Sequence, residues 1–174
     1  MIRITTTGFT ADDLAGWQQL SFDQFTATSL SVTARARTVV HMPNTIQLDE
    51  VSAYLADMAA IAIDFPALTD GRGFSLARLI RIAGFTGRLR AVGLLLPHQF
   101  RHLCQVGFDE YLAREKTAIR FPESLWQDQL EATSFSYQNR LSGGLSFNQE
   151  EPAIGQYQCR DSRVKSRHDG CLGG

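Results

Sequence analysis

The sequence has few cysteines and no cysteine pattern typical of a metal or iron–sulfur site. Its 174 residues include three cysteines, Cys104, Cys159 and Cys171. Because no Cys-x-x-Cys pair occurs, the usual zinc-ribbon, thioredoxin-like and iron–sulfur patterns are excluded. Cys104 lies beside Leu103 in a predicted helix, where a thiol is expected to act as a small core residue. We therefore identify no cofactor from the sequence.

Excess basic charge and long apolar runs are also absent. The formal net charge is −1 and the pI is about 6.4, whereas nucleic-acid-binding domains carry a basic surface, so no nucleic-acid partner is expected. No apolar run approaches the roughly 20 residues that span a bilayer. The first residues, MIRITTTGFTADD, lack the apolar core of a secretory signal. We therefore expect a cytoplasmic protein with no membrane partner.

The composition is that of a globular domain followed by a tail. Hydrophobic residues make up 44% of the chain and charged residues 20%, which is enough to build one core. From Leu141 onward the sequence is rich in Gly, Ser, Gln and charged residues. We therefore predict a single domain over residues 1–140 and a flexible tail over 141–174. The local excess of positive charge after Gln158 fits either a solvated segment or a weak contact with an acidic partner.

Two apolar runs near the centre predict buried strands. Residues 59–65, AAIAIDF, end in Asp64, and residues 89–96, LRAVGLLL, form the second run. Continuous apolar runs of this length are typical of parallel strands that are covered on both faces. Residues 108–115 alternate between apolar and polar side chains and predict a third, more exposed strand.

A helix is predicted after each of the first two strands. Ser75 is the expected N-cap of the first helix, and Gly84 its end. Pro97 opens the second helix, at a position that needs no N–H, and Gly107 ends it. Because the unit of strand, loop, helix and Gly-Phe occurs twice, we predict parallel strands joined by right-handed crossovers.

The flanking segments complete the predicted fold. We expect a helix that starts near Thr10, a strand over residues 37–42, a helix over 48–58 capped by Asp49, and a helix over 123–130. The last of these is predicted to bury Leu125, Trp126 and Leu130. The fold class is therefore α/β with a small, mainly parallel sheet, arranged as half a barrel or as a flavodoxin-like fragment. Exposed sheet edges make a homo-oligomer possible.

The stretch TDGRGFS, residues 69–75, is the main candidate site. It follows a predicted parallel strand and leads into a helix, which is where α/β proteins bind anions. Arg72 offers a planar donor for phosphate, sulfate, sulfite or carboxylate. The same residues also suit an ordinary turn, in which Arg72 pairs with Asp64, and either Asp64 or Asp70 could hold a cation or orient Arg72. The candidate residues are Asp64, Thr69, Asp70, Gly71, Arg72, Gly73, Ser75 and Arg78.

Other site patterns are incomplete. The segment GRGFSL lacks the third glycine of a dinucleotide fingerprint and the lysine of a P-loop. His98 and His102 have a spacing that suits a metal on one helix face, but no third ligand follows, so no metal site is assigned. No Ser/His/Asp or Cys/His set indicates a nucleophile, and the catalytic residues stay unknown.

The stretch from Ile61 to Glu115 resembles the bacterial family called domain of unknown function 934. The likeness rests on the run T-D-G-R-G-F-S, on R-A-V-G and on G-F-D, and covers about half the chain, from near Leu48 to near Glu115. The family often has charged residues after R-A-V-G, whereas this chain has Leu94 to His98. The matching residues are Phe65, Pro66, Thr69, Asp70, Gly71, Arg72, Gly73, Phe74, Ser75, Ala77, Arg78, Arg81, Gly87, Leu89, Arg90, Ala91, Val92, Gly93, Gly107, Phe108 and Asp109.

The resemblance implies a biological process rather than a mechanism. Members of the family are commonly encoded beside assimilatory sulfite reductase and are sometimes labelled as probable oxidoreductases of sulfite reduction. We therefore expect an accessory protein of sulfur assimilation, with sulfite reductase as partner and an oxyanion as ligand. The alternatives are a small enzyme acting on a phosphorylated or sulfated metabolite, with Arg72 as anion clamp and Asp64 or Asp70 as acid/base, and an interaction scaffold that binds no ligand.

Overall fold

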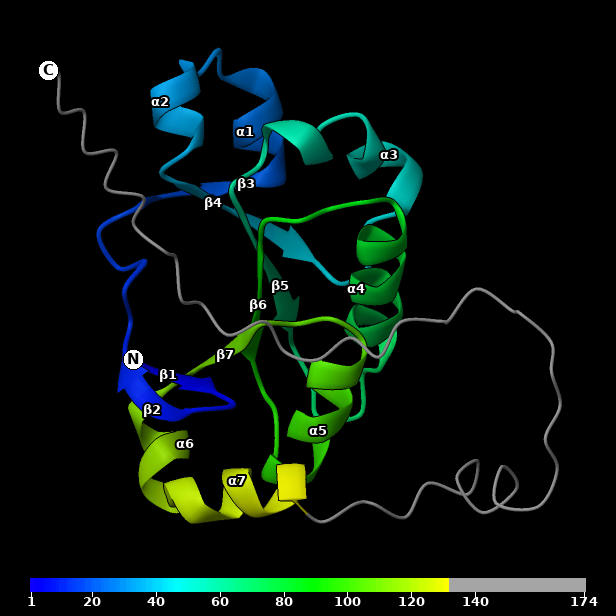
Figure 1. Cartoon of the computed structure of the whole chain (residues 1–174). Helices are drawn as coiled ribbons and strands as arrows, with labels where there is room; N and C mark the ends of the chain where they lie inside the picture. The colour runs from blue at the N-terminus through cyan, green and yellow to red at the C-terminus, as the bar shows by residue number, and fades with distance from the viewer. Residues whose placement is uncertain (132–174) are drawn as a thin grey trace, which may run out of the picture.

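Seven strands form one mixed sheet in the computed structural model, which describes residues 1–131 (Figure 1). Their order across the sheet is β2-β1-β7-β6-β5-β4-β3. The strands from β3 to β7 run parallel to one another, and β1 is antiparallel to both β2 and β7. The strands are β1 (Ile2–Thr5), β2 (Gly8–Ala11), β3 (Gln18–Ser21), β4 (Thr38–Pro43), β5 (Ala60–Phe65), β6 (Arg88–Gly93) and β7 (Glu110–Ala113).

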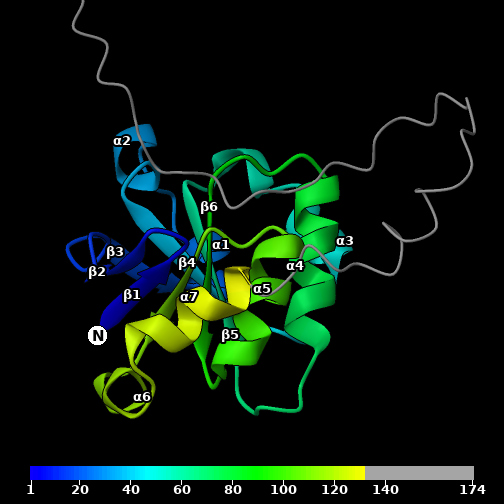
Figure 2. The same cartoon turned by 60° about the horizontal axis from the view of Figure 1, so that its bottom comes forward.

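Helices connect the parallel strands and follow the last of them. Figure 2 shows α7 lying across α5, and the two helices are in contact. Trp126 of α7 is 1% exposed and packs edge-on against Phe100 of α5. The helices are α1 (Phe22–Ala27), α2 (Val32–Arg35), α3 (Leu48–Ser52), the 3-10 turn η1 (Leu55–Asp57), α4 (Arg72–Ile82), α5 (Pro97–Gln105), α6 (Glu115–Arg120) and α7 (Glu123–Glu131).

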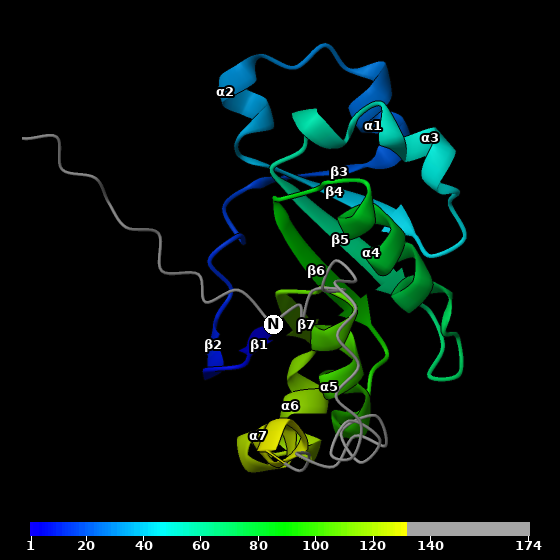
Figure 3. The same cartoon turned by 45° about the vertical axis from the view of Figure 1, so that its right-hand side comes forward.

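The helices that connect the parallel strands and bury side chains in the core all lie on one face of the sheet. The five parallel strands are neighbours in chain order, so each crossover returns to the same side. Figure 3 shows α3, α4 and α5 on this side and the segment between β2 and β3 on the other. This arrangement matches part of a β/α barrel and differs from a flavodoxin-like sheet, whose strand order reverses and places helices on both faces. The predicted α/β class with a mainly parallel sheet is confirmed.

The alternation of side chains gives the sheet a helix-covered face and a helix-free face. Ile61, Ile63 and Phe65 of β5 belong to the large core under the helices. Ala60 and Ala62 point the other way and pack under Leu14. Asp64 shares their side of the strand, so it faces away from the helices.

The prediction for the N-terminal segment is wrong. Thr10 does not start a helix, because it lies in β2, pairs with Arg3 of β1 and accepts a hydrogen bond from the Arg3 side chain at 2.8 Å. Leu14 lies in a turn and is 2% exposed on the helix-free face of the sheet. The strand register with β1 therefore overrides the local helix-start pattern.

The helix predicted over residues 48–58 is broken. It forms α3 and then η1, and its N-cap is Gln47 rather than Asp49. Gln47 takes this place because its backbone N–H donates to the carboxylate of Glu50. Tyr54, between the two helical pieces, is 37% exposed and packs edge-on against Phe22.

The strand predicted over residues 108–115 exists as β7, but it is buried rather than exposed. All four of its residues are buried because β1 pairs with its outer edge and turns it into an interior strand. The helix predicted over 123–130 is confirmed as α7, although Leu125 is 41% exposed. The predicted tail over 141–174 lies outside the described residues. No helix within residues 1–131 is long and apolar enough to cross a membrane.

Candidate functional site

The glycine loop joins the end of β5 to the start of α4, as the sequence predicts, but α4 begins four residues earlier than expected. Its first residue is Arg72 and its N-cap is Gly71, so Ser75 lies inside the helix and is not its cap. The capping contact comes from Asp70, whose Oδ1 accepts from the backbone N–H of Arg72 at 3.2 Å. The hydroxyl of Ser75 is therefore not used as the N-cap.

Arg72 pairs with Asp70 and not with Asp64. Its Nε lies 2.9 Å from Asp70 Oδ1, and its Nη2 lies 2.6 Å from Oδ2. The Arg72 side chain is 63% exposed, whereas that of Asp70 is 13% exposed. The hydrogen bond from Arg72, aided by the nearby Asn44 side chain, holds the pKa of Asp70 well below its ordinary value. Asp70 is thus a permanent anion at neutral pH.

The remaining predicted residues do not all join this pair. Asp64 is exposed on the opposite side of β5, where its charge acts on the pKa of His41. Thr69 is exposed in the loop, and Arg78 is exposed farther along α4. The structure therefore brings Asp70, Arg72 and Ser75 together and separates Asp64 from them.

A cavity of about 270 Å³ lies beside the start of α4, between this helix and the loop after β4. Arg72 and Ser75 line it on the helix side, and Asn44 and Thr45 line it on the loop side. This is the carboxyl edge of the parallel strands, where α/β proteins place ligands. Its full lining is Asn44, Thr45, Ile46, Gln47, Leu48, Arg72, Ser75, Leu76 and Leu79.

Asn44 is the unusual member of this lining. It is 5% exposed, and its Nδ2 atom makes no close hydrogen bond within residues 1–131, although the amide lies near enough to the Asp70 carboxylate to lower the pKa of that group. Asn44 could not be singled out from the sequence, because an Asn after a strand is ordinary turn chemistry.

The two glycines of the loop have different reasons to be there. A Cβ atom at Gly73 would lie 2.5 Å from the ring of Phe65, so Gly73 lets α4 pack closely on β5. A Cβ atom at Gly71 would meet nothing within 4 Å, and the φ of Gly71 is −82°. Gly73 is therefore required by the packing, whereas the fold does not require Gly71.

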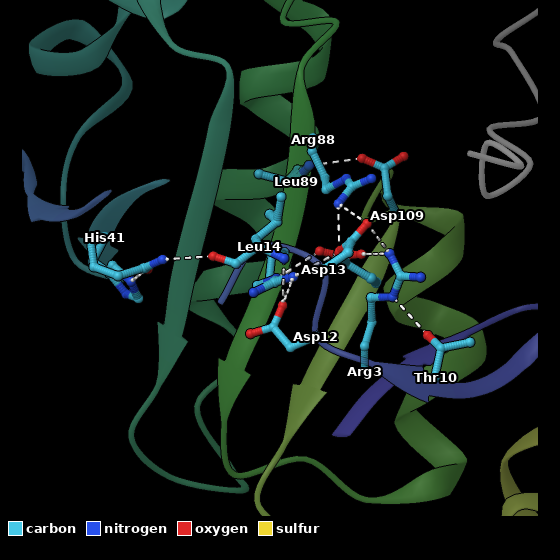
Figure 4. Close-up of polar contacts among 12 residues, drawn as sticks. Arg3, Thr10, Asp12, Asp13, Leu14, His41, Arg88, Leu89 and Asp109 are labelled. Carbon is cyan, nitrogen blue, oxygen red and sulfur yellow. Dashed lines mark hydrogen bonds and ion pairs between the residues drawn. The ribbon is translucent and has the colours of Figure 1, made fainter. Parts of the chain in front are cut away.

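A second set of charged residues lies on the helix-free face, where Figure 4 shows Arg3 and Arg88 converging on Asp13. Arg88 Nη1 contacts both oxygens of Asp13 at 2.9 and 2.8 Å, and Arg3 Nη1 lies 2.7 Å from Oδ2. Arg90 is 2% exposed and pairs with Asp12 at 2.7 Å and with Glu110 at 2.6 Å. Three arginines thus meet three carboxylates.

The positive and negative charges of this network are equal in number and paired with one another, which indicates a structural role. Burial opposes the ionisation of Asp13, but the hydrogen bond and charge of Arg88, with the charges of Arg3 and Arg90, lower its pKa. Burial raises the pKa of Glu110 against the opposing effect of the same arginines. The network ties the Asp12–Asp13 turn to the sheet. The charged alternate residues of β6, Arg88 and Arg90, were the signal that the sequence analysis overlooked.

Arg81 and Asp109, which both belong to the family pattern, form a structural contact at the amino ends of the parallel strands. Arg81 is 8% exposed along its side chain and donates to the carbonyls of Phe85, Gly87 and Gly107 at 2.8–2.9 Å. Its Nη2 lies 2.7 Å from Asp109 Oδ2, which also accepts from the backbone N–H of Leu89 at 2.8 Å. This contact joins the end of α4 to the starts of β6 and β7.

The two histidines of α5 are not brought into a metal-binding set. The ring of His102 packs on that of Phe74, with 4.8 Å between centroids. Within the part of the chain that the structure describes, no group of three or more His, Cys, Asp or Glu side chains could hold a metal ion.

These features define an α/β protein with a half-barrel arrangement of strands and a cavity at the carboxyl edge of its sheet that combines polar and apolar residues. The chain belongs to the family described as "Bacterial protein of unknown function (DUF934)", whose model matches residues 39–147. The match includes the glycine loop and extends beyond the segment 48–115 on which the resemblance rested. No curated protein and no solved structure matches the chain.

Proposed function

We propose that this chain binds an oxyanion in the cavity at the start of α4 and serves assimilatory sulfite reduction as an accessory protein. The observation that carries the binding proposal is the cavity at the start of α4, which is lined by Arg72, Ser75 and the buried Asn44. The N-terminal end of an α-helix favours an anion through its unpaired N–H groups and its dipole. The Ser75 hydroxyl adds a further donor to the lining.

Asp70 sets the strength of this site. It neutralises Arg72 in the absence of a ligand, so an anion must share Arg72 with Asp70 or replace it. Removing the charge of Asp70 should therefore strengthen anion binding, and removing Arg72 should weaken it. Because Arg72 would donate directly to the bound anion, its loss should lower the affinity about tenfold.

Calorimetry of the full chain with sulfite, sulfate and phosphate tests the binding proposal. We expect Arg72→Ala to weaken binding at least tenfold and Asp70→Asn to strengthen it. Arg78→Ala is the matched control, because Arg78 is an exposed arginine of the same helix that does not line the cavity. Equal affinities for the Arg72→Ala and Arg78→Ala variants would show that the anion does not use the loop.

The role in sulfite reduction is tested separately. We expect the tagged chain to co-purify with sulfite reductase, and we expect a strain without the chain to contain reductase of lower activity or incomplete haem and cluster loading. A fully active and fully loaded reductase in that strain contradicts the accessory role. This outcome leaves the binding proposal untouched, since calorimetry measures it on the isolated chain.

The alternative enzyme hypothesis finds less support in the geometry. Asp64 lies on the far side of β5 from Arg72, so one substrate cannot readily meet both. Asp70 does lie beside Arg72, but its lowered pKa makes it a poor proton donor at neutral pH. A binding role therefore fits these residues better than acid–base catalysis by either carboxylate.

A further inference from the structure

A second cavity adjoins the one at the start of α4. Its volume is about 300 Å³, and it lies at the carboxyl ends of β3 and β4. Thr45 and Ile46 line both cavities, so the loop after β4 forms their common wall. The lining of the second cavity is Ser21, Phe22, Asp23, His41, Pro43, Thr45, Ile46 and Glu50.

The volume of the first cavity already exceeds the needs of an inorganic oxyanion. Its 270 Å³ correspond to about nine water molecules at roughly 30 Å³ each. Sulfite has four non-hydrogen atoms, and sulfate or phosphate has five, so each fills only part of this space. Binding sites for small organic molecules usually enclose about 300–1,000 Å³, a range that the two cavities together reach.

The second cavity differs from the first in its chemistry. Arg72 is the charged residue of the first cavity, whereas Asp23 and Glu50 are carboxylates in the second. Carboxylates repel a phosphate or sulfate group and accept hydrogen bonds from hydroxyl groups. The two cavities therefore favour opposite ends of one ligand.

His41 belongs to the lining of the second cavity, but its imidazole lies on the helix-free face of β4, so it is not counted among the groups that would meet the ligand. Its Nε2 lies 2.7 Å from Gln19 Oε1, an acceptor, so Nε2 carries the proton and Nδ1 keeps a lone pair. Burial and the charge of Arg90 lower the pKa of His41 against the opposing charge of Asp64. The imidazole is therefore neutral at pH 7.

We propose that the ligand is an organic phosphate or sulfate ester, whose anionic group lies at the start of α4 and whose hydroxyl-bearing part occupies the second cavity. The anionic end of this ligand rests on the proposed function, and the hydroxyl-bearing end rests on the second cavity. A change at Asp23 tests the hydroxyl-bearing end alone, because Asp23 is exposed in the first turn of α1 and lines only the second cavity.

Calorimetry with inorganic phosphate, ribose 5-phosphate and AMP tests this inference on the full chain. We expect at least one of the two esters to bind at least tenfold more tightly than phosphate. Asp23→Asn should weaken ester binding several-fold and leave phosphate binding unchanged, whereas Arg72→Ala should weaken both.

The outcomes distinguish the inference from the proposed function. If phosphate binds through Arg72 but neither ester binds more tightly, the inference is wrong and the oxyanion site stands. If Asp23→Asn leaves the affinity for the esters unchanged, the second cavity takes no part in binding and the inference is also wrong. If Arg72→Ala changes neither affinity, or if nothing binds, both proposals are wrong.

Discussion

Replacing Arg81 by Met should destabilise the fold more than any other single change of an arginine on α4. The side chain is 8% exposed and donates to three backbone carbonyls and to Asp109. Met is unbranched and keeps the apolar stem of the side chain, so the variant removes the guanidinium donors while retaining the packing near the backbone. The carbonyls of Phe85, Gly87 and Gly107 then lose a donor at a site from which water is largely excluded.

The magnitude follows from this geometry. Breaking a buried ion pair costs about 3–5 kcal/mol, and leaving a buried acceptor without its donor costs about 1–3 kcal/mol. Asp109 is 17% exposed and still accepts a hydrogen bond from the N–H of Leu89 in the variant. We therefore expect the free energy of unfolding to fall by about 3–5 kcal/mol. Arg81→Lys should lose less, since an ammonium group keeps the charge but has three donors for four acceptors.

Urea denaturation measures the effect. With a slope of about 2 kcal/mol per molar urea, the midpoint of the Arg81→Met variant should fall by about 2 M. Arg78→Met is the control, because Arg78 is exposed and forms no hydrogen bond or ion pair within residues 1–131; we expect a change below about 0.5 kcal/mol. If both variants unfold at the same urea concentration, Arg81 does not hold the strands together.

Three further predictions concern the loop and the charge network. Gly73→Ala should cost about 1–3 kcal/mol in thermal or urea denaturation, because its Cβ would lie 2.5 Å from the Phe65 ring. Gly71→Ala should leave the stability unchanged or slightly higher, since the site is open and its φ is −82°. Asp13 has a folded-state pKa below its ordinary 3.8, so its contribution is present above that pH and is lost as the pH falls through the folded-state pKa. Asp13→Asn should therefore reduce the loss of stability between pH 4 and pH 2, and an unchanged acid profile would show that Arg88 and its neighbours do not stabilise the Asp13 carboxylate.

The central strands and helices could be predicted from the sequence because local signals agreed with the final structure there. Buried parallel strands have continuous apolar runs, and residues such as Pro97 and Gly107 mark helix ends by their own backbone preferences. Gly107 has a φ of +105°, as its expected role requires. The N-terminal hairpin could not be predicted, because β1 and β2 acquire their strand character from pairing with each other and with β7. The same long-range pairing buries Glu110, which a local alternation pattern assigns to a surface.

The site could be located from the sequence, but its contacts could not. The position of a glycine loop after a parallel strand follows from topology, which the repeated units indicate. Which aspartate pairs with Arg72 depends on side-chain direction: Asp64 points away from the helices, whereas Asp70 lies at the helix start. Asn44 comes from a separate crossover, and no local pattern links it to the loop.

The correction to Ser75 bears directly on the proposed function. As an N-cap, Ser75 would have used its hydroxyl on the backbone of α4 and would have had little left for a ligand. In the structure Asp70 makes the capping contact, and the Ser75 hydroxyl lines the cavity instead, with no hydrogen-bond partner among residues 1–131. Asp70 and Gly73 thus serve the fold, whereas Arg72 and Ser75 face the space that a ligand would occupy. The two readings of the loop, as a turn and as a binding site, therefore apply to different residues within it and do not exclude each other.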